Sequence, residues 1–204
     1  MVVAWRIYLS GSTGKKQCWL SIAFLIAVLF VFMLFLSYNE TRTGYVFNDP
    51  ALELLVPADH SSLIFLVTYG MSLMGLMFAV RQPEVFTLLL LSYAVMTVIR
   101  IFTLIILPLE APAGIIPLED IFLESSFYAG RVNLKDLFFS GHTAALFIFA
   151  FSFEKKILKW AFALSGMLVG LLLMSQHVHY SIDVIVAPLV SWLSVLLSSG
   201  ILKR

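Results

Sequence analysis

Six long apolar runs, separated by polar segments, constrain this chain more than any other feature of its sequence. The first run extends from Cys18 to about Tyr38, close to the roughly 20 residues that a helix needs to cross the hydrocarbon core of a bilayer. The chain is 61% hydrophobic and only 12% charged, more apolar than a soluble domain can bury. We therefore expect its solvent to be lipid.

These runs predict an all-α integral membrane protein, a bundle of six transmembrane helices. Residues 1–17 are expected to form a polar or interfacial arm, and residues 18–204 a single transmembrane domain. The expected spans are residues 18–38, 62–80, 85–107, 141–153, 158–175 and 181–202. No small-residue cleavage pattern follows the first run, so we expect it to be a retained helix rather than a removed signal peptide.

Basic residues are distributed unequally between the two sides of these helices. One side has Arg42, Arg131 and Lys135. The other has nine: Arg6, Lys15, Lys16, Arg81, Lys155, Lys156, Lys159, Lys203 and Arg204. Because short loops rich in Lys and Arg stay in the cytoplasm, both termini are expected to be cytoplasmic. The loops at residues 39–61 and 110–139 would then face the periplasm, lumen or exterior.

Two polar clusters flank the hairpin that the fourth and fifth runs would form. Ser140-Gly141-His142-Thr143 precedes the hairpin, and residues 177–184 (His-Val-His-Tyr-Ser-Ile-Asp-Val) follow it. Together they contain three of the four histidines of the chain. Since a hairpin returns the chain to the side from which it started, we expect both clusters to meet at the non-cytoplasmic face.

His179 and Asp183 are four residues apart, so on a helix they share one face. The carboxylate can accept the proton of one imidazole nitrogen and leave the other as a nucleophile or base. An aspartate at the end of a membrane helix is costly unless it is paired. The alternative is a histidine at a helix start beside an aspartate that is merely solvated.

Ser140 and Gly141 begin the fourth run. Ser140 can cap the helix, and Gly141 allows the backbone to approach a ligand closely. The free N–H groups of a helix start favour an anion such as phosphate. His142, in the first turn, could then donate a proton to a leaving oxygen.

Three further residues have open interpretations. Arg100, inside the third run, could bind a phosphate oxygen or extend its charge to the interface. Asp136 could orient Arg100, His142 or a lipid headgroup, or be solvated in its loop. His177 could belong to a substrate-binding loop or be a polar residue at the interface.

Other classes of function fit the sequence less well. The single cysteine, Cys18, excludes an intramolecular disulfide, and His177 and His179 have no third ligand cluster, so we expect neither a metal nor another cofactor. No basic run suggests nucleic acid. A transporter would have polar residues near the bilayer midplane and repeated halves, and a purely structural subunit would leave Asp183 and Arg100 unexplained.

These motifs resemble the type 2 phosphatidic acid phosphatase (PAP2) superfamily, and within it the sphingomyelin-synthase-like branch. The resemblance lies in Asp136-x3-Ser140-Gly141-His142-Thr143 and in residues 179–184, with a looser similarity at Arg100-x2-Thr103. The lipid-phosphatase motif Lys-x6-Arg-Pro is absent, and Gln176 follows Ser175 where the phosphatases have arginine. Leu134-Lys135 stands where the animal synthases have Cys-Gly.

The resemblance implies a PAP2-like six-helix fold and a catalytic triad of His142, His179 and Asp183. His179 would attack the phosphorus of a lipid headgroup ester, assisted by Asp183, while His142 protonates the departing alcohol. We expect substrate-binding residues around the triad: Arg100, Asp136, Ser140, Gly141, His177 and Tyr180.

The resulting hypothesis is a membrane phosphotransferase that uses a phosphohistidine intermediate. Its partners would be a phospholipid donor and an acceptor such as ceramide or a diacylglycerol-type alcohol. The alternative is a lipid phosphatase or phosphodiesterase, in which water is the acceptor.

Overall fold

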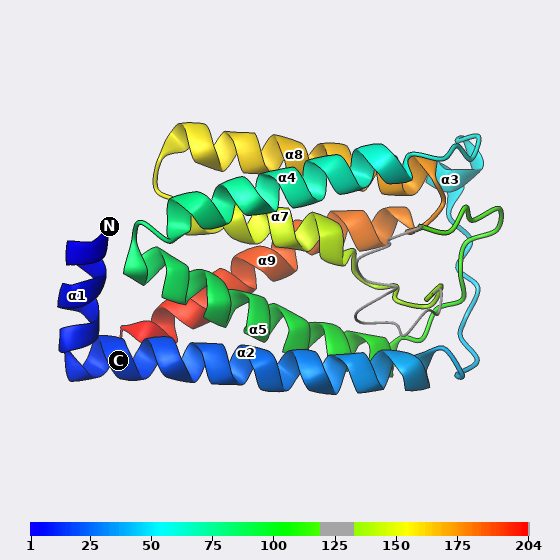
Figure 1. Ribbon diagram of the computed structural model, residues 1–204. Coiled ribbons are helices and arrows are strands. Elements are labelled where there is room, and N and C mark those ends of the chain that lie inside the picture. Colours follow the sequence, from blue (N-terminus) through cyan, green and yellow to red (C-terminus); the bar gives the residue numbers. More distant parts are fainter. Residues whose placement is uncertain (119–132, 204) are drawn as a thin grey trace.

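The computed structural model describes residues 1–118 and 133–203, so Arg131 and Arg204, counted above among the basic residues, lie outside the described part. The described residues form helices joined by loops, with no β-strand among them, as the sequence predicts. The helices are α1 (Val2–Ser10), α2 (Ser12–Asn39), α3 (Pro50–Glu53), α4 (Ser61–Ala79), α5 (Pro83–Ile106), α7 (Gly141–Ser152), α8 (Lys156–Ser175) and α9 (Ser181–Leu202) (Figure 1).

Five of these helices, α2, α4, α5, α8 and α9, are long and apolar enough to cross a membrane, which makes this a multi-pass membrane protein. The fourth predicted span corresponds to α7, which is apolar but has only 12 residues. At 1.5 Å per residue it is about 18 Å long, shorter than the roughly 30 Å hydrocarbon core. A sixth span therefore stays a prediction.

The helices pack side by side in an order that differs from their order in the chain. α2 packs against α5, α5 against α9, α9 against α7, and α7 against α8, which also contacts α4. The described chain begins and ends at the same end of the bundle, and the long loops gather at the opposite end (Figure 1). We call these the terminal end and the loop end.

An aromatic cluster joins α7 to α8 near the terminal end. The ring of Phe162 stacks on those of Phe149 and Phe153, with centroid distances of 5.1 and 5.6 Å. Gly75 of α4 allows this contact, since a Cβ there would lie 2.6 Å from the Phe149 ring. Small residues let membrane helices approach closely, and packing then stabilises the bundle.

The N-terminal arm is more ordered than the sequence suggests. Residues 12–17, expected in the arm, begin α2, and the rest of the arm is mostly the helix α1. α1 lies across the terminal end of the bundle (Figure 1). The indole Nε1 of Trp5 donates to the carbonyl of Val80 at 2.6 Å, and the Tyr8 hydroxyl donates to Thr87 at 3.2 Å.

At the loop end, hydrogen bonds between distant segments hold the connections together. Tyr45 forms an isolated bridge with Leu109. The Arg42 guanidinium donates to the carbonyls of Leu104 and Ile105, both at 2.9 Å, in the last turn of α5. A cation at a helix C-terminus satisfies free carbonyls and complements the helix dipole. The loops at this end therefore form an ordered surface around the histidine motifs.

Candidate active site

His179, two positions before α9, and Asp183, in the first turn of α9, form a buried histidine–carboxylate pair. Nδ1 of His179 lies 3.1 Å from Oδ2 of Asp183, and Asp183 is fully buried. The same Oδ2 accepts the N–H of Tyr180 at 3.2 Å. The expected i, i+4 contact is thus present, and the second bond restrains the carboxylate. Within the described residues, Asp183 Oδ1 has no hydrogen-bond partner.

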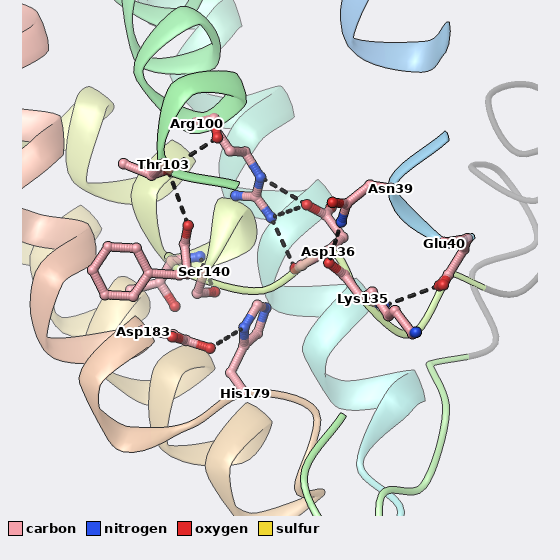
Figure 2. Close-up of polar contacts among 11 residues, drawn as sticks. Asn39, Glu40, Arg100, Thr103, Lys135, Asp136, Ser140, His179 and Asp183 are labelled. Atoms are coloured by element: carbon pink, nitrogen blue, oxygen red, sulfur yellow. Dashed lines mark hydrogen bonds and ion pairs between the residues drawn. The ribbon is translucent and has the colours of Figure 1, made fainter. Parts of the chain in front are cut away.

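A backbone hydrogen bond joins the two motifs, which are more than forty positions apart in the chain. The N–H of Ser140 donates to the carbonyl of Asp183 at 3.1 Å. Ser140 also caps α7, since its hydroxyl accepts the N–H of Thr143 at 3.3 Å. Figure 2 shows Ser140 between the His179–Asp183 pair and Arg100. The start of α7 is thereby held against the start of α9.

Gly141 provides space for the guanidinium of Arg100. A Cβ at position 141 would lie 2.4 Å from Nη1 of Arg100 and 2.9 Å from its Cζ, so any larger residue would displace the cation. Nη1 is buried and has no hydrogen-bond partner within the described residues. An unpaired donor beside the positive end of α7 is a suitable environment for an anion.

The remaining donors of Arg100 hold Asp136. Nη2 lies 2.9 Å and Nε 3.0 Å from Oδ1 of Asp136, and Nη2 also donates to the Asp136 carbonyl at 3.3 Å (Figure 2). The rings of Phe32 and Phe139 cover the guanidinium, 5.8 and 5.5 Å from Cζ. Only 6% of the Arg100 side chain is exposed. This burial favours a role inside the bundle over a charge that extends to the interface.

Helices α2 and α5 hold the segment that leads into the Ser140 motif. Oε1 of Glu40 accepts the N–H groups of Leu134 and Lys135, and the Asn39 amide donates to the Lys135 carbonyl at 2.8 Å. The Thr103 hydroxyl lies 3.1 Å from the carbonyl of Phe138 (Figure 2). The segment that carries Asp136 is therefore held by hydrogen bonds both before and after that residue.

His142 is only partly buried and lines a cavity of about 480 Å³ between α2, α4, α5 and α7. Its ring lies 6.1 Å from that of Phe65 of α4. Arg100, Asp136 and Gly141 line the same cavity. The cavity thus connects the anion-binding environment with the interior of the helix bundle.

His177 and Tyr180 bind the loops above the site. Nδ1 of His177 lies 2.8 Å from the carbonyl of Ala113, and Nε2 lies 3.2 Å from that of Leu55. The Tyr180 hydroxyl donates to the carbonyl of Glu110 at 3.0 Å. His177 therefore joins both the residue 39–61 loop and the residue 107–118 loop to the motif before α9, and Tyr180 joins the second of these loops to it. The role of both residues in substrate binding stays a prediction.

Asp49 contributes to the site, although the sequence suggested no role for it. Its carboxylate accepts the N–H of Ser181 at 2.5 Å and the Ser181 hydroxyl at 3.0 Å, in the first turn of α9. Burial raises the pKa of Asp49, but the hydrogen bonds from Ser181, Ala51 and Leu52 outweigh it and hold the pKa below its ordinary value of 3.8. The Asp49-Pro50 dipeptide, a common start of a helix, was the sequence signal from which a structural role for Asp49 could have been inferred.

The site thus combines a buried histidine–carboxylate pair, a second histidine in the first turn of α7 and an arginine with one donor that no other described residue binds. This set can supply a nucleophile or base, a proton donor and electrostatic stabilisation of an anion. Residues 1–118 and 133–203 contain no group of three or more His, Cys, Asp or Glu side chains arranged to hold a metal ion.

Replacing Asp49 by asparagine is expected to destabilise the protein at neutral pH by about 1–3 kcal/mol, because hydrogen bonds to a charged, buried acceptor are lost. The folded-state pKa of Asp49 is below 3.8, so wild type keeps this stabilisation above that pH and loses it as the pH falls through the folded pKa. Thermal unfolding in detergent should show the difference at pH 7 and its decrease in acid.

The matched control is Glu53→Gln, which removes an exposed carboxylate from the adjacent α3. It should leave the midpoint of unfolding close to that of wild type. An equal loss of stability for Asp49→Asn at neutral and strongly acidic pH would contradict the assigned role of the charge.

One known family matches the segment that contains both histidine motifs. Residues 135–199 match the family model described as PAP2 superfamily C-terminal, a segment that includes Asp136, Ser140, His142, His179 and Asp183. No curated protein and no solved structure matches the chain. The family match, over the part of the chain that carries both histidine motifs, supports membership of the PAP2 superfamily and an enzyme of the lipid phosphatase or phosphotransferase type.

Proposed function

We propose that the protein is a membrane phosphotransferase of sphingomyelin-synthase-like type. It would move a phospho-headgroup from a glycerophospholipid to ceramide or a diacylglycerol-type alcohol. The observation that carries the proposal is the junction at Ser140, where the His179–Asp183 pair meets the start of α7 and the Nη1 of Arg100, which has no hydrogen-bond partner in the described part of the chain.

His179 is the nucleophile in this proposal. The Asp183 carboxylate accepts a hydrogen bond from Nδ1–H, so the lone pair of the neutral imidazole is on Nε2. Nε2 attacks phosphorus and forms a P–N bond, while the bond from phosphorus to the glycerol oxygen breaks. His142 gives its proton to that oxygen, and the diacylglycerol leaves as a neutral alcohol.

The second step reverses the first with a different alcohol. His142, now without its proton, removes the proton of the acceptor hydroxyl. The acceptor oxygen attacks phosphorus, and the P–N bond breaks, which restores His179. In the alternative, a lipid phosphatase or phosphodiesterase, water takes the place of this hydroxyl and the headgroup phosphate is released.

Arg100 and the start of α7 are proposed to stabilise the negative charge that develops on the phosphoryl oxygens. Preorganised donors in a site of low dielectric contribute more than the same donors in water. The bond to Asp136 holds Arg100 in place, and Gly141 leaves room for its Nη1 at the helix start. This is a positioning role for Asp136 and a binding role for Arg100.

Substitution of the histidines should separate their two roles. His179→Gln should abolish both turnover and the trapped phosphoenzyme, because the nucleophile is missing. His142→Gln should lower turnover by about 10²–10⁴-fold while a phosphoenzyme still forms slowly, because only the proton transfer is lost. Rapid quenching with a phosphate-labelled phospholipid measures both quantities.

His60→Gln is the matched control, since His60 contacts Ser175 and lies outside the proposed triad. It should retain turnover within a few-fold of wild type. Normal turnover by His179→Gln would exclude the covalent mechanism.

The identity of the acceptor is tested with a phospholipid that carries a label in its headgroup. In vesicles with ceramide, the label should move to the ceramide and yield one new phospholipid, which thin-layer chromatography separates. A diacylglycerol acceptor regenerates the donor's lipid class, so it is supplied with chains of a different length and its labelled product is identified by mass spectrometry. Without an acceptor, turnover should nearly stop. Label that appears only as free headgroup phosphate, at a rate unchanged by the acceptor, would establish the hydrolase instead.

We also propose that the loop end of the bundle faces the periplasm, lumen or exterior. Basic residues at the terminal end, among them Lys15, Arg81 and Lys155, support this orientation through the positive-inside rule. In a Cys18→Ala background, an impermeant maleimide should label Tyr45→Cys in intact cells. Glu154→Cys should react only after permeabilisation, and the opposite pattern would reverse the orientation.

A further inference from the structure

The cavity beside His142 has polar side chains at one end and apolar side chains at the other. Its lining at the loop end includes the polar side chains of Arg100, His142 and Thr68. Toward the terminal end the walls are apolar, with Leu76, Leu89 and Phe86 farthest along the helices from the loop end. A ligand that fits both parts has a charged or polar head and a hydrocarbon body.

The dimensions of the cavity suit one hydrocarbon tail. Arg100 and Phe86 line its two ends and belong to the same helix, α5. The fourteen residue steps between them correspond to about 21 Å at 1.5 Å per residue. One leaflet of the bilayer contributes roughly 15 Å of hydrocarbon, half of the core, so the cavity is long enough for an extended tail.

The polar end of the cavity determines which way such a molecule lies. The Arg100 donor Nη1 is buried and unpartnered within the described residues, and so is the hydroxyl of Thr68. An anionic head at Arg100 satisfies the first. The ester or amide that links head to tail can accept from the second. The tail is then directed along α5, away from the loops.

At the opposite end, the arm packs against one of the lining residues. Phe86, in the first turn of α5, lines the cavity, and the indole of Trp5 packs edge-on against its ring at 5.6 Å. Trp5 is held in turn by its hydrogen bond to the Val80 carbonyl. The Phe86 ring at this end of the cavity is therefore packed against a side chain of α1 and is not free to move.

We propose that this cavity holds one hydrocarbon tail of the lipid substrate, and that Phe86, supported by Trp5, limits the length of that tail. The identity of the head rests on the proposed function. The placement of the tail rests on the cavity itself. Residues of α2, α4, α5 and α7 line the cavity, and in the ribbon α5 and α7 lie between α2 and α4 (Figure 1).

Occupancy is tested without turnover, in purified His179→Gln protein. The probe is phosphatidic acid with a diazirine at the end of one acyl chain, and mass spectrometry locates the cross-links. We expect cross-links on residues near Phe86, Leu89 and Leu76 that excess unlabelled phosphatidic acid removes. Cross-links confined to the outer surface of the bundle, or not displaced by the unlabelled lipid, would overturn the proposal.

A matched pair of substitutions on α4 tests the same point. Ser72 lines the cavity, so Ser72→Phe should fill it and lower the internal cross-linking at least tenfold. Gly70 is two residues away, outside the lining, and a Cβ there meets nothing within 4 Å. Gly70→Phe should therefore cross-link as the parent does. Equal internal cross-linking by both variants would contradict the tail site.

The length limit is tested in active protein with phospholipids that carry lauroyl, palmitoyl or arachidoyl chains. Phe86→Ala should raise the kcat/KM of the longest relative to the palmitoyl lipid, by about fourfold for each additional methylene that becomes buried. Leu76 of α4 lines the same end of the cavity as Phe86, so Leu76→Ala gives a second test if Phe86→Ala folds poorly. An unchanged chain-length profile in both variants would refute the limit.

The two sets of measurements fail independently. Internal cross-linking without turnover of any lipid by wild type would contradict the proposed function and support the tail site. Turnover with cross-links only outside the bundle would support the function and overturn the tail site.

Discussion

The arrangement of the site depends on Asp183, which binds both histidine motifs at one buried position. Its side chain accepts from His179 and from the Tyr180 N–H, and its backbone carbonyl accepts the N–H of Ser140. A fully buried carboxylate is costly unless it is hydrogen-bonded or charge-paired. These bonds reduce that cost and at the same time fix the distance between the starts of α7 and α9, so the same residue stabilises the fold and orients the proposed nucleophile.

A second buried pair, Arg100 with Asp136, sets the charge on the other side of Ser140. Removing one partner of a buried ion pair usually costs about 3–5 kcal/mol, because the other charge stays uncompensated. Next to Gly141, one Arg100 nitrogen has no hydrogen-bond partner among residues 1–118 and 133–203. The pair therefore positions the cation without using all its donors, as an anion-binding site requires. Asp49 and the loop contacts of His177 hold the remaining side of the site in place.

Much of the local structure could be predicted from residues close together in the chain. The i, i+4 spacing of His179 and Asp183 and the Ser140 cap need only a helix, and both are present. The pairing of Arg100 with Asp136 was one of several open alternatives, because thirty-six positions separate them. Asp49 was missed for the same reason: its acceptor role depends on Ser181, which a loop brings to it only in the folded chain.

The sequence by itself determined that the chain forms apolar helices with two histidine motifs at their ends. Hydrophobic runs and short-range spacings report directly on burial in lipid and on shared helix faces. Only the tertiary structure decided that the arm is a helix packed under Phe86, that α7 has 12 residues, and that a cavity leads inward from His142. These features arise where α1, α2, α4, α5 and α7 meet, and contacts between segments distant in sequence leave no regular pattern in the order of residues.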